Sequence, residues 1–204
     1  LAWLIARSPK KFRDLLLLLV ILPFWSNFLI RIYAWMILLG PQSALTKMVN
    51  LVVTAFGHEP VSLLFTPFAV IVCLVYVHLP FMVLPLYAVF SDLRNDMLLA
   101  SQDLGASKRQ TFWHVVLPLT TPGIISGVLL VLLPAMGMFY VADILGGSRN
   151  LLVGNIIKNQ FLDARDWPFG AAASVLLTIA MAVLLLAYRA SSRRIGKTDF
   201  NEVA

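Results

Sequence analysis

Long apolar runs dominate this chain, and its polar residues gather between the runs instead of alternating with apolar ones. The runs cover residues 15–39, 68–90, 115–141 and 169–188. Each approaches or exceeds the roughly 20 residues that a helix needs to cross a bilayer, whereas strands of a membrane β-barrel would alternate in units of about ten residues. The pattern predicts an all-α, polytopic membrane protein with a first span over residues 14–39. In the third run, Gly123 and Gly127 have the spacing that allows two helices to approach closely.

Composition agrees with this class. The 204 residues are 60% hydrophobic and 13% charged, whereas a soluble domain carries roughly 25% charged residues. Residues 1–6 read as the end of another apolar segment, and basic residues follow at once, an order opposite to that of a cleavable signal peptide. We therefore expect further spans upstream of Leu1.

The basic residues are sorted by loop. Eleven of the 16 Lys and Arg residues precede the first span, lie between the second and third, or follow the fourth, and the two other loops hold Lys47, Arg149, Lys158 and Arg165. Positive charge accumulates on the cytoplasmic side of membrane proteins. The 91–117 loop and the C-terminus are therefore predicted to be cytoplasmic. The net charge of +6 indicates topology, and a nucleic-acid partner is excluded.

The 91–117 loop carries the signals of two short helices. Asn95-Asp96 is a candidate N-cap for a helix over residues 97–104, which Gly105 would end. Ser107 and Gln110 have the spacing of a capping box for a second helix that ends near His114. The loop predicts a protruding elbow that a cytoplasmic partner grips through apolar side chains, and an amphipathic connector on the membrane surface is the alternative. These apolar side chains are Leu98, Leu99, Leu104 and Phe112.

The elbow resembles the "EAA" loop of type I ABC importer permeases. The consensus of that loop is Glu-Ala-Ala, a glycine after three further residues, and a later Leu-Pro, which match Ala100, Gly105 and Leu117-Pro118. Leu99 stands where the glutamate is usual, and Ser101 replaces the second alanine. In that family the loop forms the coupling helix that docks into the ATPase subunit. The resemblance implies a coupling role for Leu99, Ala100, Ser101, Gly105, Phe112 and Pro118.

Further segments resemble the permeases of spermidine/putrescine importers, and this similarity covers essentially the whole chain. The segments are residues 23–33, 140–147 and 165–170, together with Asn155. The resemblance implies one permease domain over residues 1–204 with the type I importer fold, lacking about two of six spans. It also implies a bacterial inner-membrane complex that contains a second permease, an ATP-binding dimer and a periplasmic polyamine-binding protein. ATP and Mg would then be bound by the partner ATPase, and this chain would hold no cofactor.

The sequence lacks the motifs of nucleotide-binding and hydrolytic sites. It contains no Gly-x-x-x-x-Gly-Lys-Ser/Thr phosphate loop, no His-Glu-x-x-His zinc helix and no Gly-x-Ser-x-Gly turn. No two histidines or cysteines stand at metal-ligand spacing, so no metal site is predicted. We expect a transporter subunit, not an enzyme, that takes its energy from a partner through the elbow.

A polyamine is a flexible, multiply charged cation, so its path needs carboxylates and aromatic faces. Asp143 is the first candidate, because it follows an apolar run and intramembrane acids are commonly functional. A helix-end or loop-capping aspartate is the alternative. Tyr140 is the expected aromatic companion of Asp143. Trp167 and Asp166 are candidates in the outer loop, where an interfacial anchor and a solvated charge are the respective alternatives.

Arg31 is a charge within the first apolar run. Since a cation is a poor ligand for a polyamine, the favoured interpretation pairs Arg31 with an acid of this subunit or of the second permease. Snorkelling to the outer surface is the alternative. Asn27, one turn earlier, is expected to help hold Arg31.

Two other functions stay open at this point. The same architecture could carry another solute, such as an organic cation, an amino acid or ferric iron. A protein of a different class, an intramembrane enzyme or scaffold, would use the elbow only as a surface helix, and the lack of a paired catalytic constellation argues against it.

Overall fold

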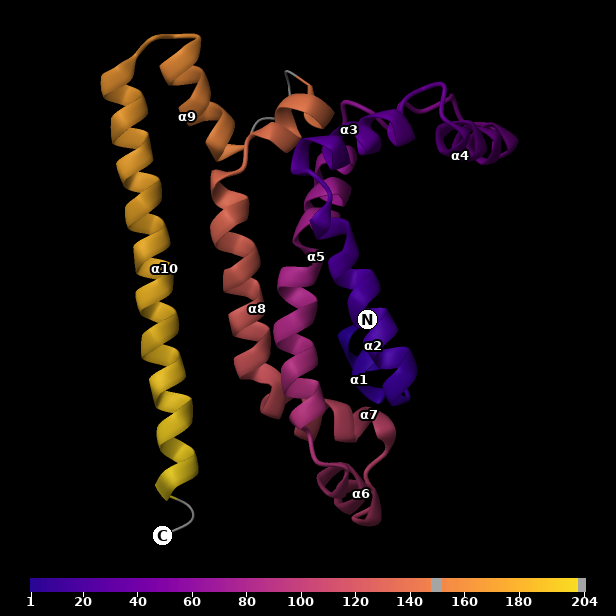
Figure 1. Cartoon of the computed structure of the whole chain (residues 1–204), viewed down its shortest axis with the longest axis vertical. Helices are drawn as coiled ribbons and strands as arrows, with labels where there is room; N and C mark the ends of the chain where they lie inside the picture. The colour runs from indigo at the N-terminus through magenta and orange to yellow at the C-terminus, as the bar shows by residue number, and fades with distance from the viewer. Residues whose placement is uncertain (148–151, 202–204) are drawn as a thin grey trace. The chain divides into compact units, whose positions relative to one another are not determined.

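The computed structural model of the chain describes residues 1–147 and 152–201 (Figure 1). Every regular element in these ranges is helical, which confirms the all-α prediction. Arg149, assigned above to an outer loop, lies outside the described residues. Four segments are long and apolar enough to cross a membrane: Phe28–Ala55, Pro67–Asp92, Lys108–Gly137 and Trp167–Leu186. The chain divides into two compact units, and several helices run from one unit into the other.

The prediction of one uninterrupted span over residues 14–39 is wrong. Helix α2 (Lys10–Ile21) ends in the 3-10 turn η1 (Leu22–Trp25), and α3 (Phe28–Leu39) begins only after this turn. Pro23 lacks a backbone N–H to continue the helix. The side chain of Asn27 then accepts a hydrogen bond from the Leu29 N–H and caps α3. Helix α4 (Ala44–Ala55) follows α3 after a turn and is capped by Ser43.

The first unit comprises Leu1–Val20, Leu79–Leu133 and Ile179–Ala204. Helices α1 (Ala2–Arg7) and α2 pack against the second half of α5 (Pro67–Asp92), around the buried side chains of Ala2, Ile5 and Val83. Figure 1 shows α1 and α2 beside this half of α5. The hydroxyl of Tyr188 in α10 (Trp167–Asn201) lies 2.9 Å from Ser126 Oγ of α8 (Leu117–Gly137), which ties α10 into the same unit.

The close helix approach predicted at Gly123 and Gly127 is confirmed. A Cβ atom at Gly123 would lie 2.6 Å from Val89 Cγ2, and one at Gly127 would lie 2.7 Å from Met82 Sδ. At Gly123 only glycine therefore lets α8 pack this closely against α5, whereas at Gly127 the flexible Met82 side chain could move aside. Helix α8 ends at Gly137, short of residue 141, where the apolar run ends.

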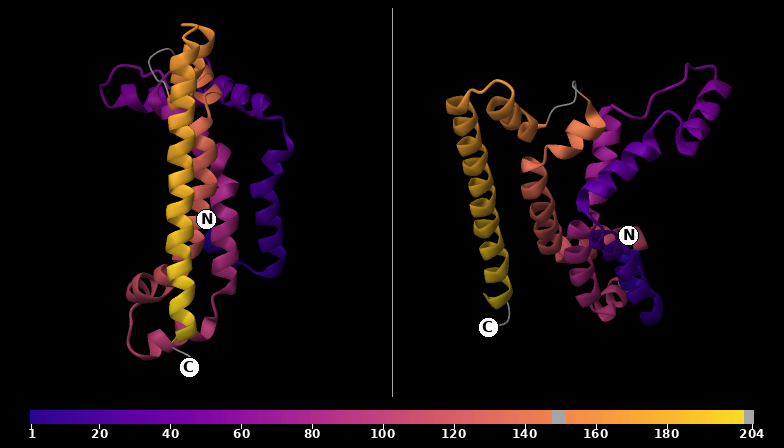
Figure 2. Two further views of the ribbon diagram at one scale, coloured as in Figure 1. Left: turned by 90° about the vertical axis from the view of Figure 1, so that its left-hand side faces the viewer. Right: turned by 45° about the horizontal axis from the view of Figure 1, so that its top comes forward.

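The second unit comprises Ile21–His78 and Pro134–Thr178. Its core packs α3 against the first half of α5 and against the π-helical turn η3 (Ala142–Gly146), with Ile32, Cys73 and Leu145 fully buried. Helix α9 (Val153–Leu162) and the start of α10 meet at a tight corner (Figure 2). At this corner a Cβ atom on Gly170 would lie 2.9 Å from the Phe161 ring. Helix α9 makes up most of the described chain between η3 and α10, and residues 163–166 form the non-helical turn between α9 and α10.

Candidate functional site

The elbow consists of two short helices and a π-helical turn, all in the first unit. Helix α6 (Asn95–Asp103) ends before Gly105, whose φ of 85° lies in the left-handed region that favours glycine. Helix α7 (Lys108–Thr111) begins with the predicted capping box: the Gln110 N–H donates to Ser107 Oγ at 3.3 Å, and the Ser107 N–H donates to Gln110 Oε1 at 2.8 Å. The turn η2 (Phe112–Val116) leads directly into α8.

Two details of the elbow differ from the sequence prediction. Helix α6 begins at Asn95 with Arg94 as its N-cap residue, and Asp96 in its first turn pairs with Arg94 at 3.1 Å. The predicted N-cap at Asn95-Asp96 is therefore wrong. Leu98 is partly buried and lines a cavity. The exposure predicted for the other apolar side chains is confirmed for Leu99, Leu104 and Phe112, which are 58%, 89% and 40% exposed.

Ser101 connects α6 to α7 through a hydrogen bond. Its Oγ lies 2.8 Å from Oγ1 of the buried Thr111 and also donates to the Leu98 carbonyl at 3.0 Å. The Thr111 hydroxyl is then the donor to Ser101, so a single hydroxyl links the two helices. The alanine that is usual at this position could not make this bond. Ala100 on α6 and Pro118 at the start of α8 are exposed.

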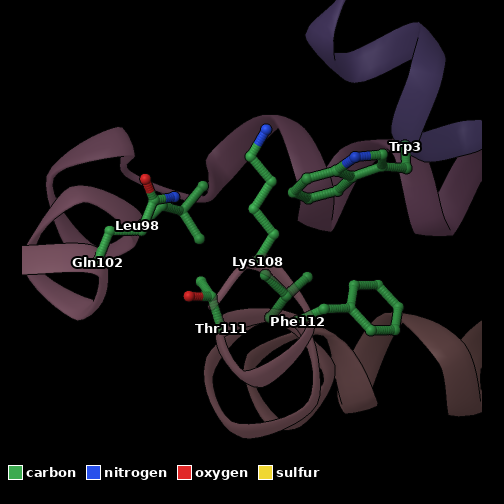
Figure 3. A pocket seen from close by; sticks show the side chains of 7 residues that line it. Trp3, Leu98, Gln102, Lys108, Thr111 and Phe112 are labelled. Atoms are coloured by element: carbon green, nitrogen blue, oxygen red, sulfur yellow. The ribbon is translucent and has the colours of Figure 1, made fainter. Parts of the chain in front are cut away.

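A cavity of about 270 Å³ lies between the elbow and α1. It is lined by Trp3, Leu98, Gln102, Lys108, Thr111, Phe112 and Val116. Figure 3 shows the Lys108 side chain rising between Leu98 and Trp3, with Thr111 and Phe112 on another side. The Trp3 ring packs edge-to-face with Phe90, with the ring centroids 5.2 Å apart, and the Arg7 guanidinium carbon lies over the Trp3 ring, 4.7 Å from its centroid. The elbow therefore borders open, largely apolar space on the side of α1.

Asp143 lies in η3 of the second unit, after the end of α8. Its Oδ1 accepts a hydrogen bond from Asn155 Nδ2, and its Oδ2 lies 2.7 Å from Lys158 Nζ. Asn155 is fully buried, donates also to the Phe139 carbonyl at 3.1 Å, and accepts a bond from the Leu152 N–H at 3.0 Å. Helix α9 thus presents Asn155 and Lys158, one turn apart, to the two carboxylate oxygens.

Two aromatic rings complete this arrangement. Phe139 and Tyr140 stack with their ring centroids 4.1 Å apart, and Lys158 Nζ lies 5.8 Å from the Phe139 centroid. We refer to Phe139, Tyr140, Asp143, Asn155 and Lys158 as the Asp143 cluster. The side chains of Asp143 and Lys158 keep 30% and 24% of their surface exposed, and Tyr140 is 48% exposed. A carboxylate beside ring faces and open to solvent is suited to binding an organic cation. Within residues 1–147 and 152–201, no group of three or more His, Cys, Asp or Glu is placed to hold a metal ion.

The candidates from the outer loop belong to the corner between α9 and α10. Asp166 accepts a hydrogen bond from the Phe169 N–H at 3.0 Å and so caps α10. Trp167 begins α10, is 66% exposed, and meets the Phe161 ring edge-on at 5.9 Å. Among the described residues, no hydrogen bond, ion pair or ring contact joins Asp166 or Trp167 to the Asp143 cluster.

Sequence reasoning did not assign three members of the cluster to the site: Phe139, Asn155 and Lys158. Lys158 counted only as a charge of the outer side. The available signal was its spacing of three residues from Asn155, which places both side chains on one face of a helix.

Arg31 lies in α3 against the rings of Phe24 and Phe28, with its guanidinium carbon 4.8 and 5.8 Å from their centroids. Its Nε and Nη1 are buried and have no hydrogen-bond partner among the described residues. The expectation that Asn27 helps to hold this side chain stays a prediction. The Asn27 side chain caps α3, and only the backbone N–H of Arg31 bonds to the Asn27 carbonyl, at 3.2 Å.

The family follows from comparison with known proteins. The model of the family described as "Binding-protein-dependent transport system inner membrane component" matches residues 1–197. The chain belongs to this family. The spermidine/putrescine transport system permease protein PotB of Salmonella typhimurium (strain SL1344) is 53% identical over 196 residues, which cover 96% of this chain and 68% of the relative. PotB of Escherichia coli (strain K12) is 54% identical, with 96% and 70% covered.

One more distant relative and two solved structures are also similar to the chain. The inner membrane ABC transporter permease protein YdcU of Escherichia coli (strain K12) is 30% identical over 213 residues, 98% of this chain and 65% of the relative. The crystal structure of a bacterial ABC transporter that imports the acidic polysaccharide alginate matches with a TM-score of 0.69 at 19% identity, covering 95% of this chain and 70% of that one. The crystal structure of a bacterial alginate ABC transporter in complex with an alginate pentasaccharide-bound periplasmic protein gives a TM-score of 0.72 at 20% identity, with the same coverage. The expected fold, that of an ABC importer permease, is confirmed, and the chain is an inner-membrane component of a transport system.

Proposed function

We propose that this chain is a permease subunit of an ABC importer for polyamines and that the Asp143 cluster forms part of the solute path. The observation that carries the proposal is that the Asp143 carboxylate already holds a primary ammonium, that of Lys158, beside the Phe139 ring. A carboxylate and an aromatic face are the two groups that recognise an alkylammonium. Relatives above 50% identity are named for spermidine and putrescine. In this role Asp143 binds an ammonium of the solute and Tyr140 offers its exposed ring to the methylene chain.

In this proposal the elbow and the C-terminus are cytoplasmic. The elbow transmits the conformational change that ATP hydrolysis drives in a partner subunit. The partner is a dimer of ATP-binding subunits, which supplies the bound ATP and Mg that this chain has no motif to hold. The exposed side chains of Leu99, Leu104 and Phe112 dock into a groove of the ATPase. Because Leu99 replaces the usual glutamate, this contact is apolar and not a salt bridge. Gly105 sets the corner between the two helices, and the bond between Ser101 and Thr111 keeps the elbow stiff.

Closure of the ATPase dimer moves the elbow, and the movement passes into α8, which continues from η2 without a break. Helix α5, which carries Pro80 and Pro85, bends in response, because each proline removes a backbone hydrogen bond. Access to the path at Asp143 then reverses. A second permease and a periplasmic solute-binding protein complete the complex. Asp166 and Trp167, exposed at the corner of α9 and α10, form the surface that meets the binding protein.

The proposal is tested with the full-length protein reconstituted in liposomes with the ATPase, second permease and binding protein encoded beside it. ATP hydrolysis is measured with spermidine, putrescine, amino acids and ferric iron in turn. Stimulation by polyamines is expected, and Asp143→Asn should reduce it by about tenfold or more, as the loss of a charge-assisted contact does. Glu59→Gln removes an exposed acid of the second unit outside the cluster, and this control should leave the stimulation unchanged.

The other outcomes discriminate between the alternatives. Stimulation by a different solute alone would keep the importer architecture and discard the polyamine assignment. Full stimulation by polyamines in Asp143→Asn would remove Asp143 from the solute path. A chain that does not assemble with an ATPase would support the scaffold reading of the elbow.

A further inference from the structure

The Asp143 cluster contains an alkylammonium of its own. A lysine side chain is a primary ammonium at the end of a flexible four-carbon stem, and putrescine is a four-carbon chain with an ammonium at each end. Lys158 Nζ lies 2.7 Å from Asp143 Oδ2 and 5.8 Å from the Phe139 centroid. The site therefore holds one of its own side chains in the way that the proposed function has it hold the solute.

We propose that Lys158 is a tethered competitor of the solute, which must be displaced from Asp143 and which thereby selects diamines and longer polyamines over monoamines. This inference rests on the proposed function, because it assigns Asp143 to the solute path. It concerns a residue that acts through Asp143, and it adds a determinant of specificity to the site.

The cluster consists of a fixed part and a movable part. Asn155 is fully buried and bonds to Asp143, Phe139 and Leu152, so it holds Oδ1 of the carboxylate in place. The described contacts of the Lys158 side chain are the ion pair with Oδ2 and the distant ring of Phe139. The two side chains of this ion pair are 24% and 30% exposed, and an ion pair that water can reach contributes little free energy and exchanges readily. Lys158 can therefore leave while the carboxylate stays in its position.

The selectivity for diamines follows from the change in binding free energy when a solute ammonium replaces Lys158 at Asp143. A monoamine that replaces Lys158 gives Asp143 the contact it had before, so the net attraction is close to zero. A diamine brings the same first contact and a second ammonium. That second ammonium can bind elsewhere, for example over the exposed face of Tyr140. The competitor thus cancels the affinity that a single ammonium provides and leaves only what the rest of the solute contributes.

The test uses the complete complex, trapped with ATP and vanadate, and measures the binding of radiolabelled putrescine in competition with n-butylamine. Lys158→Met removes the ammonium and keeps an unbranched side chain. It should lower the half-saturating putrescine concentration by about fivefold, the ratio expected for a partly exposed ion pair, and should make n-butylamine an effective competitor. Lys158→Arg should keep n-butylamine excluded. Lys47→Met, which removes an exposed lysine of α4 in the same unit, should leave both quantities unchanged.

A second readout does not depend on a variant. The extent of acetylation of Lys158 relative to that of Lys47 is measured by mass spectrometry on the native complex. This ratio should rise severalfold when putrescine displaces the Lys158 ammonium. Because putrescine also consumes acetylating reagent, the ratio to Lys47 corrects for the reagent that is lost. Unchanged affinity and continued exclusion of n-butylamine in Lys158→Met would overturn the inference, as would an acetylation ratio that putrescine does not move. If putrescine binds in a manner that needs Asp143 but Lys158 does not respond, only this inference fails. If putrescine neither binds nor stimulates ATP hydrolysis, the proposed function fails with it.

Discussion

Asn155 fixes the geometry of Asp143, although it carries no charge. Its buried amide joins three segments: the Phe139 carbonyl after α8, the Asp143 carboxylate in η3 and the Leu152 N–H at the start of α9. A buried polar group that loses its partner costs more free energy than the bond itself provides. The order of the cluster therefore depends on this one side chain.

Asn155→Ala should lower the free energy of unfolding by about 1–3 kcal/mol, because it removes a fully buried amide together with its hydrogen bonds to Phe139, Asp143 and Leu152. The measurement is the thermal unfolding of the detergent-solubilised complex. Gln160→Ala, a partly buried amide on the same helix, serves as the control. Equal losses in the two variants would show that the amide of Asn155 has no special role.

The sequence identified part of this cluster and missed the rest for a physical reason. Asp143 and Tyr140 stand out because an acid and an aromatic at the end of an apolar run are locally unusual. Lys158 is 15 residues from Asp143, and nothing local indicates that α9 packs against η3. Pairs of this kind depend on tertiary packing. Asn27 shows the same dependence on structure. Its short distance from Arg31 in the sequence suggested a side-chain contact, but its side chain is oriented toward the Leu29 N–H that it caps.

Local chemistry predicted the boundaries of elements better than hydropathy did. The capping box of Ser107 and Gln110 starts α7 where it was expected. Hydropathy alone cannot distinguish one long helix from two shorter helices in line. The interruption at Pro23 within residues 14–39 was therefore missed.

Gly123 and Gly127 of α8 face side chains of α5 that differ in flexibility, so alanine at the two positions should have different effects on stability. At Gly123 an added methyl group meets Val89, a β-branched side chain, and the Pro85 carbonyl at 3.2 Å, whereas at Gly127 it meets the end of the flexible Met82. Gly123→Ala should therefore destabilise the protein by about 1–3 kcal/mol, the range for overpacking, and Gly127→Ala by clearly less. Gly137→Ala, where the space is open, is the control for both. Thermal unfolding ranks the three variants, and the reverse order for Gly123 and Gly127 would contradict the packing of α8 on α5.

A comparison of Gly105 with Gly57 can distinguish a role of the elbow in coupling from an effect of backbone strain. Gly57 has a similar φ of 79°, and at both positions an added Cβ meets no atom within 4 Å. Alanine at either site should thus cost a similar strain of about 1–2 kcal/mol. Only Gly105→Ala is expected to lower the solute imported per ATP hydrolysed, because only that corner lies in the coupling element. Equal coupling in the two variants would argue against a stiff elbow.

At the scale of the whole molecule, the proposed assembly with an ATPase would depend on apolar surface. Leu104 at the elbow corner is 89% exposed, a cost in water that a partner would relieve. Leu104→Ala should weaken the binding of the ATPase to the permease pair by about tenfold, the effect of removing one well-buried leucine from an interface. Leu162→Ala, at the exposed end of α9, should not change it. Binding is measured by titrating labelled ATPase onto nanodiscs, and equal affinities for the two variants would place the docking surface elsewhere.

Neither compact unit is a continuous stretch of chain, and this fixes the order in which they can form. The ribosome has delivered every segment of the second unit once Thr178 is made. The first unit still lacks its part of α10 at that moment, including Tyr188, whose hydroxyl bonds to Ser126. The nascent chain can therefore assemble the Asp143 cluster before the unit that contains the elbow is closed. A newly made chain would then complete the Asp143 cluster first and the unit that contains the elbow last.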